Sequence, residues 1–83
     1  MRAALLREVD GPFELVDVPE PAVDGKVIVR VRAAGINFAD VMVRRGLYPQ
    51  MPELPAVIGS EIAGELEDGT RVMAITSGGG GYA

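Results

Sequence analysis

The chain has 83 residues, of which 48% are hydrophobic and 24% are charged, and its formal net charge is −4. This composition is typical of one small globular domain and argues against a disordered chain. The negative charge disfavours a nucleic-acid partner or an anionic membrane, and no apolar run approaches the roughly 20 residues of a membrane helix. The N-terminal residues lack the apolar centre of a signal peptide, so we expect a cytoplasmic protein.

The sequence contains no cysteine and no histidine. These absences exclude a disulfide, a thiolate nucleophile and a Ser-His-Asp triad within this chain. A zinc site would have to be built from carboxylates alone, which is rare for zinc. We therefore expect no metal site.

Two strands are expected first, over residues 2–8 and 13–18, with Asp10 and Gly11 between them. An Asp-Gly pair between two β-type segments is a strong hairpin signal, so we expect these strands to pair antiparallel. Pro19 ends the second strand, since proline donates no ladder hydrogen bond.

Residues 26–34 carry the clearest strand pattern of the sequence. Valines alternate there with Arg30 and Arg32, and this period of two predicts one buried and one exposed face. The two arginines are either an anion-binding pair or a solvated face, and we expect the solvated face.

A short helix with signals at both ends comes next. Asn37 suits the N-cap position, and Asp40 lies three residues on, where a capping-box partner belongs. Gly46 suits the left-handed residue that closes a helix. Tyr48 follows on a loop over residues 48–55, which three prolines stiffen. The helix start and Tyr48 thereby place polar groups at one edge of an otherwise apolar domain.

Two more strands are expected over residues 62–66 and 70–76, with Asp68 and Gly69 as a second hairpin signal. At least five strands and one helix, with turn signals about every 8–12 residues, predict a mainly antiparallel β barrel or sandwich. The composition shifts nowhere before the terminal glycines, so residues 1–83 are expected to form one domain.

The glycine run at positions 78–81, followed by Tyr82 and Ala83, formally matches G-x-G-x-x-A. That pattern binds a dinucleotide only where it opens a helix within a βαβ unit, with an acidic residue about 20 positions on. The chain shows neither. We expect a flexible connector into another strand, and we expect this chain to be the N-terminal piece of a longer polypeptide.

Glu61 lies between the apolar segments 56–58 and 62–63, and we expect it to be partly buried. A buried carboxylate must be paired or protonated. It either orders a site or accepts from backbone amides, and the residues alone favour the structural role.

Three segments, in this order and spacing, carry a family resemblance: Asn37-Phe38-Ala39-Asp40 after Ala33-Ala34-Gly35, then Arg45-Gly46-Leu47-Tyr48-Pro49, then Pro55-Ala56-Val57-Ile58-Gly59-Ser60-Glu61-Ile62-Ala63-Gly64. Together they resemble the N-terminal segment of the quinone oxidoreductases, the zeta-crystallin-like, zinc-free branch of the medium-chain dehydrogenase/reductase superfamily. The resemblance covers nearly all of the chain. One departure is the short link over residues 65–67, where the family often has a longer loop.

The resemblance implies a GroES-like catalytic domain: mainly β with one short helix, in a partly open β-barrel. It also implies a Rossmann domain that binds NADPH and is absent from this chain, with the active site in the cleft between the two. Zinc-dependent relatives carry Cys and His at the positions that look like Asn37 and Ser60 here, so no catalytic metal is implied. The full-length protein is expected to be a homodimer.

The implied reaction is hydride transfer from NADPH to a quinone or another activated C=C acceptor. Tyr48, Asn37 and Asp40 are the expected catalytic residues, with Asp40 positioning Asn37 and the helix start. Asn37, Phe38 and Tyr48 are the expected cofactor-binding residues. Other roles stay open: Asn37 as a cap alone, Tyr48 as a loop anchor, and Phe38 as core packing.

Two other functions remain open. The first is another zinc-free reductase, such as an enoyl or acryloyl-CoA-type enzyme, whose N-terminal segment would look much the same. The second is a non-enzymatic GroES-like module. A chaperonin-type contact would need a mobile apolar loop, and the proline-rich loop over residues 48–55 argues against it.

Overall fold

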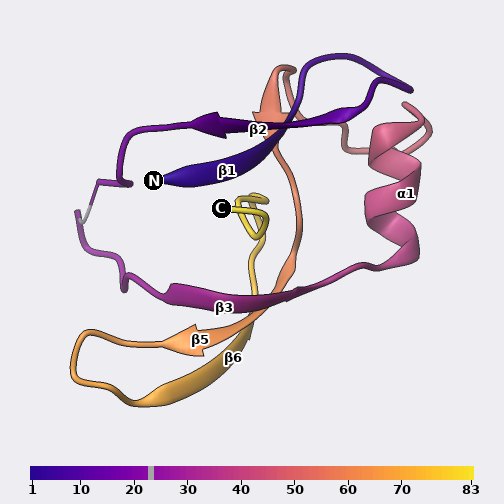
Figure 1. Ribbon diagram of the computed structural model, residues 1–83. Coiled ribbons are helices and arrows are strands. Elements are labelled where there is room, and N and C mark those ends of the chain that lie inside the picture. Colours follow the sequence, from indigo (N-terminus) through magenta and orange to yellow (C-terminus); the bar gives the residue numbers. More distant parts are fainter. Residues whose placement is uncertain (23) are drawn as a thin grey trace.

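The computed structural model describes residues 1–22 and 24–83, which form two three-stranded antiparallel sheets with one helix beside them (Figure 1). The first sheet has the order β2-β1-β4, and its strands are β1 (Arg2–Leu6), β2 (Phe13–Asp17) and β4 (Ala56–Val57). The second has the order β3-β5-β6, and its strands are β3 (Arg30–Gly35), β5 (Glu61–Glu65) and β6 (Arg71–Ile75). The helix is α1 (Phe38–Arg44).

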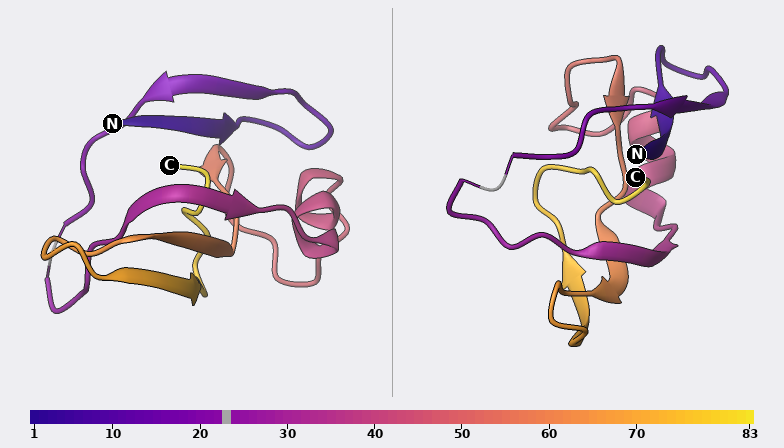
Figure 2. Two further views of the ribbon diagram at one scale, coloured as in Figure 1. Left: turned by 60° about the horizontal axis from the view of Figure 1, so that its bottom comes forward. Right: turned by 60° about the vertical axis from the view of Figure 1, so that its left-hand side comes forward.

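The predicted fold class is confirmed: the chain is mainly β with one short helix. Within the described residues the two sheets stay separate and do not close into one barrel. They lie as two layers, with α1 along one side of both (Figures 1 and 2). In this part of the chain, no helix has the length and apolarity that a membrane crossing requires.

The β1–β2 hairpin forms as predicted, with Leu6 opposite Phe13. β1 ends at Leu6 and does not reach residue 8, because the loop that follows bonds to the helix. The Asp10 N–H donates to the Arg44 carbonyl at 2.8 Å. In return the Arg44 guanidinium donates to the carbonyls of Gly11 at 2.9 Å and Asp10 at 3.0 Å. The last turn of α1 is thus attached to the first sheet.

The predicted start of the third strand at residue 26 is wrong. β3 begins at Arg30, which lies opposite Glu65, the last residue of β5. Because the chain turns directly after Glu65, residues 26–29 have no partner strand in this sheet, and Val27 is 74% exposed.

The alternation of β3 is also interrupted. The register shifts between Val31 and Ala33, which leaves Arg32 as the extra residue of a bulge. Arg32 is exposed and lies 3.4 Å from the Glu65 carboxylate. The arginine face is therefore solvated, as expected.

The helix has the predicted bounds, and its end is a Schellman motif. Gly46 has φ +73. Its N–H donates to the Val43 carbonyl at 3.0 Å, and the Leu47 N–H donates to the Met42 carbonyl at 2.8 Å. These two bonds satisfy carbonyls that the helix itself leaves free.

The terminal glycine segment is not the flexible connector that the sequence predicts. It turns back between the two sheets, where the C-terminus lies in Figures 1 and 2. The N–H groups of Gly81 and Tyr82 donate to the carbonyls of Gly59 at 2.9 Å and Ile58 at 3.0 Å. The Tyr82 carbonyl accepts from the Ala4 N–H at 2.8 Å. This segment therefore joins β1 to the turn between β4 and β5.

The core is small. Leu6, Val43 and Ile58 form its buried centre, so that one residue each comes from β1, α1 and the β4–β5 turn. Partly buried side chains pack around it: Tyr48, Met51, Leu54, Ala56 and Tyr82. The outer face of the second sheet is uncovered, and Met73 and Ile75 are each 85% exposed.

We expect Gly46→Ala to lower the free energy of unfolding by about 2 kcal/mol, because it combines left-handed strain with crowding. A Cβ at Gly46 would meet the two Val9 Cγ atoms at 3.0 and 3.1 Å. Gly25→Ala is the matched control, since Gly25 has φ +64 and nothing within 4 Å. Gly25→Ala should lower the free energy of unfolding by about 1 kcal/mol, because it adds left-handed backbone strain without crowding. Urea unfolding measures both, and equal losses would contradict a role for the Val9 contact.

Candidate functional site

The start of α1 is fixed by a buried carboxylate. Asn37 is the N-cap residue, with extended backbone angles of φ −113 and ψ 162. Its N–H donates to the Asp40 Oδ2 at 2.9 Å, which is the bond that Asp40 makes in a capping box. Asp40 is only 7% exposed. Its carboxylate is therefore an internal anchor for Asn37.

Asp40 also faces Tyr82, a residue that the sequence analysis did not connect with the site. Burial and the negative charge of Asp40 raise the pKa of the Tyr82 hydroxyl above its usual value. The ring lies against Gly59, where a Cβ would approach the Tyr82 Cδ1 to 2.6 Å. The one sequence signal for this contact was an aromatic residue directly after a glycine run.

Glu61 contacts the other side of Asn37. The Asn37 side-chain nitrogen donates to the Glu61 Oε2 at 3.1 Å. The predicted burial of Glu61 is wrong: Ile62 and Gly64 take the inward positions of β5, so Glu61 lies on the outward face and is exposed. Of the two roles considered for Glu61, contact with a candidate site residue is the one that the structure shows.

Tyr48 and Asp40 line the same pocket, which has a volume of about 520 Å³. Its apolar walls include Ala39, Val43 and Val57, and its hydroxyl groups include Ser60, Thr76 and Ser77. No lysine or arginine lines it among the described residues. The pocket thus offers uncharged polar groups and one buried carboxylate.

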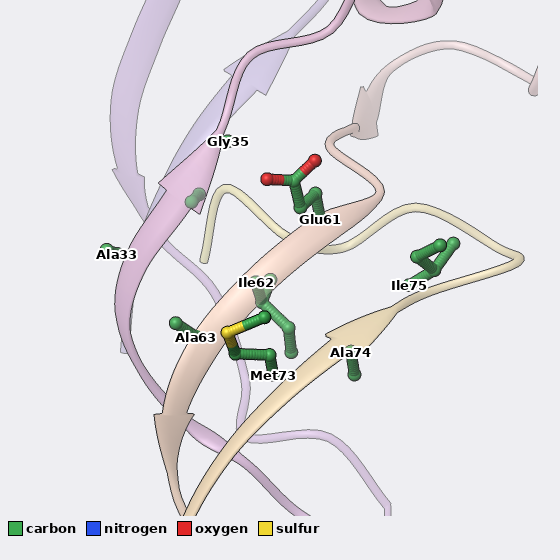
Figure 3. Close-up of a pocket in the computed structure, with 9 residues that line it drawn as sticks. Ala33, Gly35, Glu61, Ile62, Ala63, Met73, Ala74 and Ile75 are labelled. Atoms are coloured by element: carbon green, nitrogen blue, oxygen red, sulfur yellow. The ribbon is translucent and has the colours of Figure 1, made fainter.

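A second, shallower groove of about 690 Å³ runs across the outer face of the β3-β5-β6 sheet. Figure 3 shows Glu61 at one end of it, beside Gly35, and the side chain of Met73 beside Ala63. Apart from Glu61, alanine, glycine, isoleucine and methionine make up its lining. Glu61 is therefore the polar group that connects this apolar face with Asn37.

The structure brings two of the predicted site residues, Asp40 and Tyr48, to one pocket, and neither Asn37 nor Phe38 is among the residues that line it. The Asn37 backbone N–H donates a hydrogen bond to the Asp40 carboxylate, and Asp40 lines the same pocket as Tyr48. Phe38 is 76% exposed, so the alternative of core packing is wrong for it here. Across residues 1–22 and 24–83, no three carboxylate side chains gather closely enough to hold a metal ion.

We expect Tyr82 to titrate above pH 10.0 in the folded chain. In a Tyr48→Phe background Tyr82 is the one remaining tyrosine of this sequence, so ultraviolet absorbance reports it alone. Asp40→Asn should lower the midpoint, because it removes a negative charge that opposes tyrosinate. The folded pKa is the higher one, so the stability from this group is complete below about pH 10 and is lost as pH rises through the folded pKa. A midpoint that is the same with and without Asp40→Asn would contradict the Asp40 contact.

Comparison with known proteins agrees with this fold. Residues 23–79 match the model of the alcohol dehydrogenase GroES-like domain. Mouse quinone oxidoreductase-like protein 2 is 40% identical over 79 residues, covering 93% of this chain and 23% of that protein. An NAD-dependent alcohol dehydrogenase of Sulfurisphaera tokodaii is 34% identical over 87 residues, covering 94% and 25%.

A solved structure of an oxidoreductase is also similar to this chain. The quinone oxidoreductase of Thermus thermophilus, studied alone and with NADPH, superimposes with a TM-score of 0.87 at 44% identity, covering 96% of this chain and 27% of that one. The chain spans about a quarter of the length of each of these three proteins. It belongs to the family of alcohol dehydrogenase GroES-like domains.

Proposed function

We propose that this chain is the N-terminal catalytic domain of a longer, metal-free oxidoreductase, which reduces quinones or related activated C=C acceptors with NADPH. The observation that carries the proposal is the pocket that Tyr48 and Asp40 line together with the hydroxyl groups of Ser60 and Thr76. The likeness to quinone oxidoreductases, one of them studied with NADPH, supports the choice of reaction.

The pocket residues fit one end of the cofactor. Hydroxyl groups next to apolar walls suit an uncharged polar ring such as nicotinamide, which needs a few hydrogen bonds and exclusion of water. Among the residues that the structure describes, the lining contains no cationic side chain to hold phosphate groups. In our proposal the phosphates are held by residues of a second, Rossmann-type domain.

The cofactor would supply the hydride, and this chain would supply orientation and hydrogen bonds. The Tyr48 hydroxyl is the donor that we assign to the acceptor oxygen, whose negative charge grows during reduction. Asn37 is held at the helix start by Asp40. Asp40 is buried and bonded within the protein, so it positions other groups and does not exchange protons with the substrate.

Other cofactors and acceptors would use the same pocket groups. A relative is named as an NAD-dependent alcohol dehydrogenase, and an enoyl or acryloyl-CoA-type reductase would use the same groups. A zinc-dependent reaction is disfavoured, because this segment has neither cysteine nor histidine to offer as a ligand. We place the enzyme in the cytoplasm as a homodimer.

For the full-length protein, we expect Tyr48→Phe and Asn37→Ala each to lower kcat/KM by about 10- to 100-fold, because each removes a hydrogen-bonding group near the reacting atoms. The measurement is an assay of NADPH oxidation across a panel of quinones, enones and enoyl thioesters. Glu53→Ala, an exposed change on the same loop as Tyr48, is the control and should leave kcat/KM unchanged. Unchanged kinetics in both site variants would remove these residues from the site.

The 83-residue chain alone is expected to oxidise no NADPH with quinones, because the groups that hold the cofactor phosphates lie elsewhere in our proposal. The same assay with the purified chain and a protein-free blank measures this. Turnover above the blank would overturn the proposed division of the site between two domains.

A further inference from the structure

We propose that Glu61 is a positioning residue that fixes the side-chain amide of Asn37, and that Gly35 is required because it leaves room for the Glu61 carboxylate. The inference rests on the proposed function for its effect on catalysis. The contact itself is open to test without any activity.

The three residues meet where β3 and β5 pair. Gly35 ends β3 and lies directly opposite Glu61, the first residue of β5. Figure 3 shows the Glu61 side chain beside Gly35 at the end of the sheet. Asn37 follows Gly35 by two residues, and its side-chain nitrogen reaches the Glu61 Oε2 at 3.1 Å. The sheet register therefore places the carboxylate next to the helix start.

Glycine is needed at position 35 because a larger side chain would not fit there, and not because the backbone adopts an unusual conformation. A Cβ at this position would lie 2.5 Å from the Glu61 Oε1 and 2.7 Å from its Cδ. The backbone of Gly35 lies outside the left-handed region, so alanine would meet no strain of its own there. An alanine would push the carboxylate away from its present place over β3.

A carboxylate fixes the direction of an amide. The two ends of an asparagine side chain have almost the same shape, but one donates and the other accepts. An ionised carboxylate only accepts, so Glu61 selects the nitrogen end of Asn37. Because Asp40 holds the Asn37 backbone N–H at 2.9 Å, the residue is anchored twice. A ligand would then meet one orientation of the amide.

The charge of Glu61 also limits what Asn37 can bind. Like charges a few ångström apart repel, and water screens them only partly next to a protein surface. A phosphate or an oxyanion is therefore disfavoured at this end of α1. We assign Asn37 to a neutral polar part of the bound molecules, and leave the developing oxyanion to Tyr48.

The contact is tested first by NMR of the ¹⁵N-labelled full-length protein. The Asn37 side-chain amide signals are identified as the pair that disappears in Asn37→Ala. They should move in Glu61→Ala and in Gly35→Ala. Glu65→Ala is the control and should leave these signals at their positions. Glu65 lies on the same strand, but its carboxylate is 3.4 Å from Arg32. Asn37 amide chemical shifts that are unchanged in Glu61→Ala would overturn the inference, whether or not the protein reduces quinones.

The effect on catalysis is tested by a double-mutant cycle. Glu61→Ala should lower kcat/KM about tenfold through misplacement of Asn37, and Glu61→Gln should restore it, because its amide oxygen still accepts from Asn37. In an Asn37→Ala background, Glu61→Ala should have less than about a twofold further effect, because the two residues act as one unit. Additive losses would show that Glu61 acts independently of Asn37 and overturn the positioning role.

Discussion

The side chain of Tyr82 holds the two sheets and the helix in one arrangement. Its ring packs edge-on against Phe13 of the first sheet, with centroids 5.8 Å apart and planes at 78°. It also lies over Gly59, at the entry to the second sheet, and its hydroxyl faces Asp40 of α1. Because the core cluster of the described residues is small, the chain depends on such a bridging aromatic side chain, since small cores contribute little stability alone.

This bridge also determines the site. Asp40 is buried between Tyr82 and the Asn37 N–H, so the residue that starts the helix is held from the interior. Glu61 holds the same residue from the outer face of the sheet. At its other end, α1 is attached to the β1–β2 loop through Arg44. A short helix, which would be marginal by itself, is thereby fixed at both ends against two different sheets.

The parts that the sequence predicted correctly are those with local signals. The helix and its Gly46 closure depend on residues within a few positions of one another, and so do both Asp-Gly hairpins. β4 and the late start of β3 were missed because they depend on pairing with strands far along the chain, as with Leu6 opposite Ala56. Glu61 and Tyr82 were misjudged for the same reason: their partners come from distant segments, which no local pattern reveals.

The hydrogen bond from the Ala4 N–H to the Tyr82 carbonyl joins two segments that lie far apart in the sequence, and such a contact affects the order of folding. Hairpins and a capped helix form from near neighbours, whereas the contact between Ala4 and Tyr82 requires closure of a long loop. The sheets are therefore coupled late. During synthesis, which runs from the N-terminus, β1 is complete long before residue 82 is made. Until then the cluster of Leu6, Val43 and Ile58 lacks the Tyr82 side chain that packs against it, and exposed apolar surface of this kind favours aggregation of a folding chain.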